Sequence, residues 1–412
     1  MTHFKKNRLI KFHLPDNKLA SLKEVSFLED SKCTIESFDS LFFDFGQTLS
    51  KAILTNKLLK RIPAFTALGF WLRKSNLEEL VKESSILENR KYLFPKGLVL
   101  HICPANVDTM FVYSLMISLL CGNKNLLRIS RRIDSPLISE LILLLNNILA
   151  SDQYRVLKEY IHIVSYDRDH DITDYFSSIA DVRIIWGGDN TISVFKKFTT
   201  KPRVKDLYFA DRNSMSIIKP KSFFELDEKG KEVFIKNFYN DVYTFDQLGC
   251  SCPQSLFILG SIEDADKFLI EFEVYLRAHV EKMYDNDIFS IANLKLNKIA
   301  LDCLDQKIDK VYNPTNYVNF VQLKASSLLD SCGAGYLYYK QINDLTELNK
   351  FINKKVQSIS YLGLSQDEIR NILLSNMGEG IDRIVPVGKA LNFHYLWDGF
   401  NLFNELTSSK YY

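Results

Sequence analysis

The 412-residue sequence predicts an α/β protein built from two doubly wound domains. Short apolar runs alternate with longer helical stretches along most of the chain. The connections between them are short, which favours parallel strands joined by right-handed helical crossovers. The alternation runs through residues 95–218 and starts again after Lys219. We therefore predict an N-terminal segment at 1–94, α/β domains at 95–218 and 219–384, and a C-terminal tail at 385–412.

Composition narrows the class of protein. Hydrophobic residues make up 46% and charged residues 25%, as in ordinary soluble globular proteins. A net charge of +2 gives no electrostatic reason to expect a nucleic-acid partner. The longest apolar run, Met110–Cys121, is about a dozen residues, whereas a membrane span needs roughly 20. The N-terminus lacks the apolar region of a secretory signal.

Cysteine usage points to a reducing compartment. The seven cysteines are odd in number and contain no paired C-x-x-C spacing. They indicate neither a disulfide framework nor a structural zinc site, so we expect no metal. We predict a cytoplasmic protein.

The N-terminal segment and the first domain follow in order. Residues 54–84 form the clearest helical stretch, interrupted by Pro63. The pattern then predicts a strand at 97–102 and an apolar helix at 107–121, which Gly122 ends. Further strands are expected at 125–129, 160–164 and 182–186, and helices at 138–150 and 171–179. Ligands bind at the carboxyl ends of such strands, where residues 103–106 and 187–190 lie.

In the second domain, residues 234–249 are largely helical, followed by a strand at 256–259 and a long helix at 265–283. A strand at 356–361 and a helix at 365–377 come later. The tail begins with a strand-like run at 383–388 and continues into aromatic-rich residues 393–400.

Between these elements stands the stretch FDQLGCSCPQSLFI, residues 245–258. Its two cysteines are badly spaced for a disulfide and incomplete as a metal site. Both can be small apolar core residues, because free cysteine is among the most buried residue types. Cys250 can also be a nucleophile at a loop-to-strand junction, with a backbone N–H to hold an oxyanion. Cys252, directly before Pro253, has the more structural position.

Other candidates are equally open. Asn106 can donate to a carbonyl oxygen from the start of a helix, or serve only as an N-cap. The Gly187-Gly188 pair can be a simple turn, and the dinucleotide fingerprint G-x-G-x-x-G is absent. His101 is expected to be a hydrogen-bonded core histidine. The chain has no G-x-S-x-G elbow and no Walker loop, which argues against an α/β-hydrolase and a P-loop ATPase.

Taken in order, several stretches resemble the LuxC-type fatty acyl-CoA reductases: residues 64–74, 94–107, 120–130, 245–254 and 382–399. The resemblance extends from about residue 40 to 405. That family belongs to the aldehyde dehydrogenase superfamily. The resemblance implies its fold, with a nucleotide-binding domain at 95–218 joined by the N-terminal segment, and a catalytic domain at 219–384. It also implies a C-terminal oligomerisation-type tail and a homo-oligomer.

The resemblance assigns roles to individual residues. Cys250 falls on the catalytic cysteine, and Asn106 on the asparagine that forms the oxyanion hole with the cysteine N–H. Arg128, with Ser130 beside it, falls where a lysine usually contacts the adenosine ribose. An arginine there can pair with a 2′-phosphate, so NADPH is expected and NADH is possible.

Gly188 and Asp189 fall on the turn near the cofactor pyrophosphate, where glycine-serine is usual. The hydrolytic members of the superfamily carry a glutamate in a stretch that corresponds here to residues 208–214, which contain none. Hydrolysis needs such a base, so its absence fits an acyl group that arrives from, or leaves to, a thiol.

The resemblance therefore implies NADPH-dependent reduction of a fatty acyl thioester, acyl-CoA or acyl-protein, to a fatty aldehyde through an S-acyl cysteine. One alternative is an acyl-accepting subunit of a reductase complex that depends on an acyl-protein synthetase. The other is an oxidative aldehyde dehydrogenase. The acyl chain length and the pathway, whether luminescence, surface polysaccharide or lipid metabolism, stay open.

Overall fold

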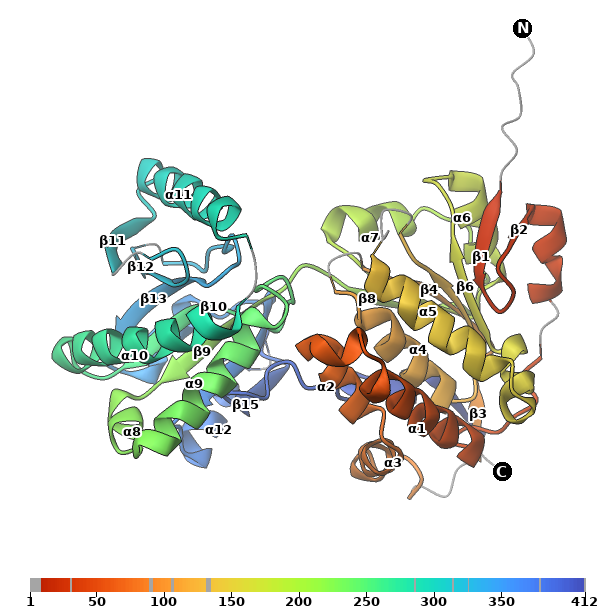
Figure 1. The fold of residues 1–412 in the computed structure, drawn as a ribbon, viewed down its shortest axis with the longest axis horizontal. Coiled ribbons are helices and arrows are strands. Elements are labelled where there is room, and N and C mark those ends of the chain that lie inside the picture. The colour runs from red at the N-terminus through yellow and green to blue at the C-terminus, as the bar shows by residue number, and fades with distance from the viewer. Residues whose placement is uncertain are drawn as a thin grey trace, which may run out of the picture. The chain divides into compact units, whose positions relative to one another are not determined.

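The computed structural model describes residues 9–29, 32–88, 92–104, 107–130, 135–284, 287–312, 315–324, 326–377 and 379–410. The chain forms two compact units, residues 1–210 together with 393–412, and residues 211–392. Each unit contains a mostly parallel sheet with helices on both faces (Figure 1). The predicted α/β fold with two doubly wound sheets is therefore confirmed.

The main sheet of the first unit is formed by β1 (Ile10–Leu14), β2 (Lys18–Ala20), β4 (Leu98–Ile102), β5 (Lys124–Arg128), β6 (Ile161–Ser165), β7 (Val182–Trp186) and β8 (Lys205–Phe209). Its helices are α1 (Ser40–Thr55), α2 (Pro63–Trp71), α3 (Lys74–Glu83), α4 (Met110–Leu120), α5 (Pro136–Leu149), α6 (His170–Ile179), α7 (Asp189–Phe195) and α13 (Leu402–Leu406). Short 3₁₀ helices lie at Leu22–Leu28, Leu59–Arg61 and Asp152–Glu159.

Within the described residues the strand order is β2-β1-β6-β5-β4-β7-β8, and the strands from β6 to β8 are parallel. Helices α6 and α7 and the first 3₁₀ helix cover one face and bury a common apolar core with it. Helices α4 and α5 lie on the other face (Figure 1). Every residue of α4 is buried, because this helix is enclosed between the sheet and α1. The chain reverses its direction of winding at β4, between β5 and β7.

The C-terminal residues return to the first unit. There β18 (Thr407–Lys410) pairs antiparallel with β3 (Tyr92–Pro95), and β16 (Leu396–Trp397) pairs with β17 (Phe400–Asn401). The hydroxyl of Tyr113 on α4 donates to the carbonyl of His394 at 2.7 Å. The tail is thus bound to its own unit. Its predicted role in oligomerisation remains a prediction.

The sheet of the second unit is formed by β9 (Asn213–Ile218), β10 (Pro253–Leu259), β11 (Ile308–Tyr312), β12 (Asn319–Leu323), β13 (Tyr336–Ile342), β14 (Val356–Leu362) and β15 (Arg383–Pro386). Its helices are α8 (Pro220–Phe224), α9 (Glu228–Tyr243), α10 (Ile262–Met283), α11 (Ile288–Leu304) and α12 (Gln366–Ser375), with a 3₁₀ helix at Leu345–Lys350.

In the described part of this unit the strand order is β11-β12-β13-β10-β9-β14-β15, parallel except for β11. Helices α8, α9 and α10 share an apolar core with one face. The other face packs against α12 and the 3₁₀ helix. The central strand β10 is flanked on both sides, so the loop that leads into it is held by neighbouring strands.

Two predicted helices differ from the structure. The stretch 54–84 is not one interrupted helix: α1 ends at Thr55, and Pro63 begins α2 at the first helical position, where its missing N–H costs nothing. The helix expected at 234–249 begins earlier, at Glu228, and ends at Tyr243. It stops because Asp246 and Gln247 adopt positive φ angles of 53° and 57°.

Helices long and apolar enough to cross a membrane are not found among the described residues.

Candidate active site

The two cysteines of the opening stretch occupy different environments. Both lie in the loop between α9 and β10, at the edge of the sheet where the parallel strands begin. Cys252 is fully buried, and burial raises the pKa of its thiol far above the ordinary value. Cys250 is half-buried. A thiolate is the reactive form of cysteine, so of this pair the half-buried Cys250 fits a nucleophile better than Cys252 does.

The backbone at Cys250 is held by the neighbouring strands. The buried hydroxyl of Ser214 on β9 donates to the Cys250 carbonyl at 2.7 Å and accepts from the Ser358 N–H at 3.1 Å. The next residue, Ser251, donates through its hydroxyl to the Gln357 side chain at 2.8 Å. Residues of two strands, Ser214 of β9 and Gln357 of β14, therefore hold the loop at the proposed nucleophile and at the residue after it.

The residues before Cys250 form a tight turn. The side chain of Gln247 is buried and donates to the Pro253 carbonyl at 3.0 Å. Its oxygen accepts from the Gly335 N–H at 2.8 Å. Asp246 accepts a hydrogen bond from the Tyr284 hydroxyl, and its carboxyl lies in a site where burial raises the pKa. The sequence pattern gave these two residues no role.

A buried lysine lies behind this turn. Lys295 on α11 is 2% exposed, and its ammonium donates to the Tyr317 carbonyl at 3.0 Å. Burial lowers its pKa to about 8, although the nearby Cys332 and Asp246 favour the charged form. This amine adds positive charge to the surroundings of Asp246.

The stretch 208–214, which lacks a glutamate, leads into β9 at the same edge of the sheet. Here Arg212 forms an ion pair with Asp382 and donates to the Val356 carbonyl at 2.9 Å. Both partners are largely shielded from solvent. Arg212 is therefore held in an ion pair, and the one carboxylate of the stretch, Asp211, is exposed.

Asn106, the predicted oxyanion donor, lies outside the described residues, so its role remains a prediction.

The predicted cofactor residues lie together at the carboxyl edge of the first sheet. Arg128 ends β5, and Ser130 follows it after one residue. Gly188 is the N-cap of α7 after β7, and Asp189 is the first residue of that helix. These two strands flank β4, where the winding reverses, and such switch points are the usual ligand sites of doubly wound sheets.

Arg128 has the features of a ligand contact. Its guanidinium lies over the ring of Tyr166, 5.2 Å from the centroid. Its Nε is buried and has no hydrogen-bond partner among the described residues. A buried donor without a partner is costly, so an incoming phosphate or ribose oxygen would satisfy it. This environment fits the nucleotide end of a cofactor.

Gly188 leaves the start of α7 without a side chain, whereas Asp189 is exposed and acidic. A negative charge at a helix N-terminus competes with a phosphate for the same positive end of the helix dipole. The glycine therefore fits a phosphate contact better than the aspartate does.

His101 is a core residue, as predicted. It is fully buried in β4, with Nδ1 2.8 Å from the Ser114 hydroxyl and Nε2 3.0 Å from the Asn125 side-chain oxygen. Burial lowers its pKa to about 4. Both ring nitrogens are engaged, which leaves none for proton transfer to a substrate.

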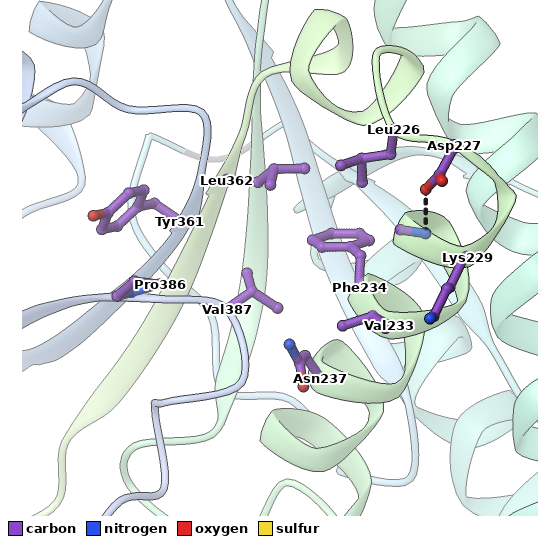
Figure 2. A pocket seen from close by; sticks show the side chains of 11 residues that line it. Leu226, Asp227, Lys229, Val233, Phe234, Asn237, Tyr361, Leu362, Pro386 and Val387 are labelled. Atoms are coloured by element: carbon purple, nitrogen blue, oxygen red, sulfur yellow. Dashed lines mark hydrogen bonds between the residues drawn. The ribbon is translucent and has the colours of Figure 1, made fainter.

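A groove of about 470 Å³ lies in the second unit at the carboxyl ends of β14 and β15. Figure 2 shows Tyr361 and Pro386 across from Val233, Phe234 and Asn237 of α9. Cys250 precedes β10, at the amino end of the same parallel sheet. The groove therefore belongs to the opposite edge and contains none of the predicted site residues.

Sequence reasoning missed Ser214, Gln247 and Gln357, the side chains that hold the Cys250 loop. Gln247 stands inside the quoted stretch, but nothing in the sequence alone indicates that its side chain is buried. Ser214 and Gln357 are distant in sequence and meet the loop only through the strand order.

Comparison with known proteins places the chain in a family. The model of the acyl-CoA reductase (LuxC) family matches residues 65–409. A long-chain acyl-protein thioester reductase from Aliivibrio fischeri is 23% identical over 308 residues, which cover 71% of this chain and 59% of that protein. A second such reductase, from Photobacterium leiognathi, is 24% identical over 301 residues, with the same coverage. The chain thus matches less than two thirds of the length of these relatives.

Solved structures show the same fold at low identity. An NADP-dependent enzyme from E. coli has a TM-score of 0.60 at 11% identity and covers 98% of this chain and 94% of its own. Aldehyde dehydrogenase 21 from Physcomitrella patens has a TM-score of 0.60 at 12% identity and covers 99% and 95%. The fold is that of the aldehyde dehydrogenases, and the chain belongs to the LuxC family of acyl-CoA reductases.

Proposed function

We propose that this chain reduces a long-chain fatty acyl thioester to a fatty aldehyde, with Cys250 as the nucleophile that carries the acyl group. The observation that carries the proposal is the contrast within the cysteine pair: Cys250 is half-buried on a fixed loop, whereas Cys252 is fully buried. Membership of the LuxC family supplies the reaction class.

In the first step, the Cys250 thiolate attacks the acyl carbonyl, forms a new C–S bond and expels the donor as a thiol. The oxyanion of the tetrahedral intermediate accepts hydrogen bonds from the Cys250 N–H and the Asn106 side chain. Ser214 holds the Cys250 carbonyl, which belongs to the peptide after the donor N–H, and so restrains the backbone on one side of Cys250. Preorganised donors of this kind need little rearrangement during the reaction.

NADPH, when bound, would supply the hydride that reduces the acyl carbon; cleavage of the C–S bond and protonation of the sulfur would then release the aldehyde and restore the Cys250 thiol. Arg128 is the proposed anchor, because its buried Nε has no hydrogen-bond partner in the part of the chain that the structure describes and a guanidinium suits a 2′-phosphate. Ser130 lies next to it, and Gly188 leaves space at the start of α7. Asp189 is the weaker member of the proposed set because of its charge. NADH remains the alternative if Arg128 contacts only the ribose.

The names of the relatives favour a protein-bound acyl donor. They are called long-chain acyl-protein thioester reductases, so we propose that this chain accepts its acyl group from a protein thioester and from acyl-CoA. An acyl-protein synthetase is then the expected partner. Turnover of NADPH with acyl-CoA alone, without a partner protein, distinguishes an independent reductase from an acyl-accepting subunit.

Oxidation of aldehydes to free acids is disfavoured. Residues 208–214 contain no glutamate, and Arg212 in that stretch is paired with Asp382. Production of free acid from aldehyde, NADP⁺ and water would contradict this reasoning.

The test is mass spectrometry of the intact protein after incubation with acyl-CoAs of different lengths, with and without NADPH. We expect one acyl adduct without NADPH and its loss as aldehyde with NADPH. Cys250→Ala should abolish both the acyl adduct and the formation of aldehyde. Folded Cys252→Ala protein should retain the adduct and the formation of aldehyde. An adduct on Cys250→Ala that is missing from Cys252→Ala would reverse the assignment.

Asn106 has its own test. Asn106→Ala should slow acylation of Cys250 by on the order of 100-fold if its amide is an oxyanion donor. A nearly normal rate would remove Asn106 from the mechanism without affecting the role of Cys250.

A further inference from the structure

We propose that Gln247 is a positioning residue: its side-chain amide closes the loop that carries Cys250 and aims the sulfur at the acyl carbonyl. The proposal rests on the proposed function of Cys250 and adds a residue that neither family membership nor sequence pattern assigned.

The turn before Cys250 is conformationally strained. Asp246 and Gln247 are consecutive non-glycine residues with φ angles of 53° and 57°. Each such residue costs about 1 kcal/mol or more and persists only where its surroundings impose it. A relaxed alternative exists, because α9 ends at Tyr243, just three residues before the turn. Something must therefore hold the turn against continuation of the helix.

Backbone bonds from the Asp246 and Gln247 N–H groups to the Tyr243 and Val242 carbonyls close the turn, and the Gln247 side chain adds a restraint from outside it. It is 2% exposed, and its Nε2 donates to the Pro253 carbonyl at 3.0 Å and lies 3.4 Å from the Tyr336 carbonyl. Its Oε1 accepts from the Gly335 N–H at 2.8 Å. Gln247 precedes Cys250 by three residues, and Pro253 follows it by three. One amide thus ties together the two ends of the loop with Cys250 at its centre, and it anchors both to the start of β13.

The loop before β13 is shaped to meet this turn. The Ala334 N–H donates to the Asp246 carbonyl at 3.3 Å. Gly333 and Gly335 have φ angles of 86° and 78°. A Cβ on Gly333 would lie 2.7 Å from the Asp246 carbonyl oxygen, so the close approach of the two backbones requires glycine there.

The requirement for an amide follows from the bonding pattern. The site presents carbonyl acceptors on one side and an N–H donor on the other, and glutamine supplies both a donor and an acceptor. An apolar residue of the same length would leave the Gly335 N–H without its acceptor and the Pro253 carbonyl without this donor. Buried groups left in that state favour rearrangement of the loop. Misplacement of a nucleophile by about 1 Å costs up to 100-fold in rate.

The test compares Gln247→Met with Gln254→Met as a matched control. Methionine has about the same side-chain length and volume as glutamine, but it cannot form the hydrogen bonds of the side-chain amide. Gln254, the second residue of β10, also binds the loop before β13, because its side-chain oxygen accepts from the Ser331 N–H at 3.0 Å. Among the described residues, its side chain makes no hydrogen bond to Asp246 or Gln247. The folded fraction is measured first by thermal unfolding. Acylation of Cys250 is then followed by intact-protein mass spectrometry over a range of acyl-CoA concentrations.

We expect Gln247→Met to lower the maximal rate of Cys250 acylation by between about 10- and 100-fold, with a nearly unchanged half-saturating concentration. Gln254→Met should stay within about threefold of the unmodified protein. A purely structural role for Gln247 would lower the melting temperature and leave the maximal rate of the folded protein unchanged. That result, or an equal loss of rate in both variants, would overturn the proposal.

Labelling of the cysteines with iodoacetamide tests the position of the loop without requiring acyl transfer, so it can fail independently of the proposed function. Absence of acyl transfer to Cys250 in the unmodified protein would refute the function alone. Alkylation of Cys250 relative to the exposed Cys303 on α11 still reports the conformation of the loop. Gln247→Met should change this ratio at least threefold, while Gln254→Met should not.

If Gln247→Met fails to fold, the Tyr284→Phe variant is used to test the proposal. It removes only the hydroxyl that donates to Asp246, on the other half of the turn. We expect a several-fold lower maximal acylation rate, and an unchanged rate and alkylation ratio would overturn the proposal.

Discussion

Acidification from pH 8 to pH 5 is expected to weaken the first unit and strengthen the second. Burial lowers the pKa of His101 and of His162 in the first unit to about 4. Burial raises the pKa of Asp241 in the second unit to about 7, even though its carboxyl accepts from the Gly388 and Ala390 N–H groups.

The signs follow from proton binding. Unfolded histidine binds a proton below about pH 6.5, whereas these folded histidines resist it until about pH 4, so stability is lost as the pH falls through this window. Asp241 behaves in the opposite way. Its folded form keeps a proton up to about pH 7 and its unfolded form only to about pH 4, so stability is lost as the pH rises between these values.

The magnitudes are measurable. One pKa unit corresponds to about 1.4 kcal/mol, so the change from pH 8 to pH 5 should cost the first unit about 2 kcal/mol for each histidine. The same change should stabilise the second unit by about 3 kcal/mol through Asp241.

The chain allows the two units to be followed separately. All three tryptophans, Trp71, Trp186 and Trp397, belong to the first unit. The urea midpoint from tryptophan fluorescence should therefore fall on acidification, while circular dichroism also reports the second unit. Asp241→Asn should remove the opposite pH dependence from the dichroism signal and leave the fluorescence midpoint unchanged. A fluorescence midpoint that is constant or rises from pH 8 to pH 5 would refute the reasoning.

Three further substitutions test the packing. Asp206→Ala should destabilise the first unit by about 3 kcal/mol or more in urea unfolding, because it strands the buried guanidinium of Arg183; a loss below about 1 kcal/mol would contradict this. Gly335→Ala should prevent stable folding of the second unit, since a Cβ there would lie 2.1 Å from the Tyr243 hydroxyl; a normal melting temperature would contradict it. Asp302→Ala should cost about 2 kcal/mol, because its buried carboxylate accepts two tyrosine hydroxyls, and an unchanged unfolding curve would refute that.

Strand positions were predictable because burial on both faces produces uninterrupted apolar runs. The strand expected at 182–186 coincides with β7, whose five residues are all buried. His101 could be recognised as a core residue for the same reason, since it stands within such a run. The ends of helices were harder to predict. Pro63 correctly indicated the boundary of a helix. We interpreted it as an interruption within one helical stretch, whereas it begins α2.

The main error concerned the residues nearest to Cys250. Residues 234–249 have helical composition, and nothing local in Asp246 or Gln247 signals a positive φ. Backbone bonds to the end of α9 close this turn, and residues about 90 positions away in the chain help to hold it, because Gly335 and Tyr336 bind the Gln247 side chain. The periodicity of apolar residues reports only the local preference for helix or strand. It cannot reveal that a second loop, next to the neighbouring strand, helps to hold a turn.

The same limit explains why the cysteine pair stayed ambiguous in the sequence. Either of two cysteines separated by one residue can be the nucleophile as far as the sequence shows, and burial in the structure distinguishes them. The turn at Asp246 and Gln247 and the bond from the Cys252 N–H to the Gly249 carbonyl at 2.9 Å direct the loop so that Cys252 enters the core and Cys250 does not. Burial raises the pKa of Cys252, which disfavours the thiolate form that a nucleophile needs. If Cys250 is the nucleophile, as proposed, backbone geometry decides which sulfur stays accessible, and substitutions in the turn should alter acyl transfer without touching either sulfur.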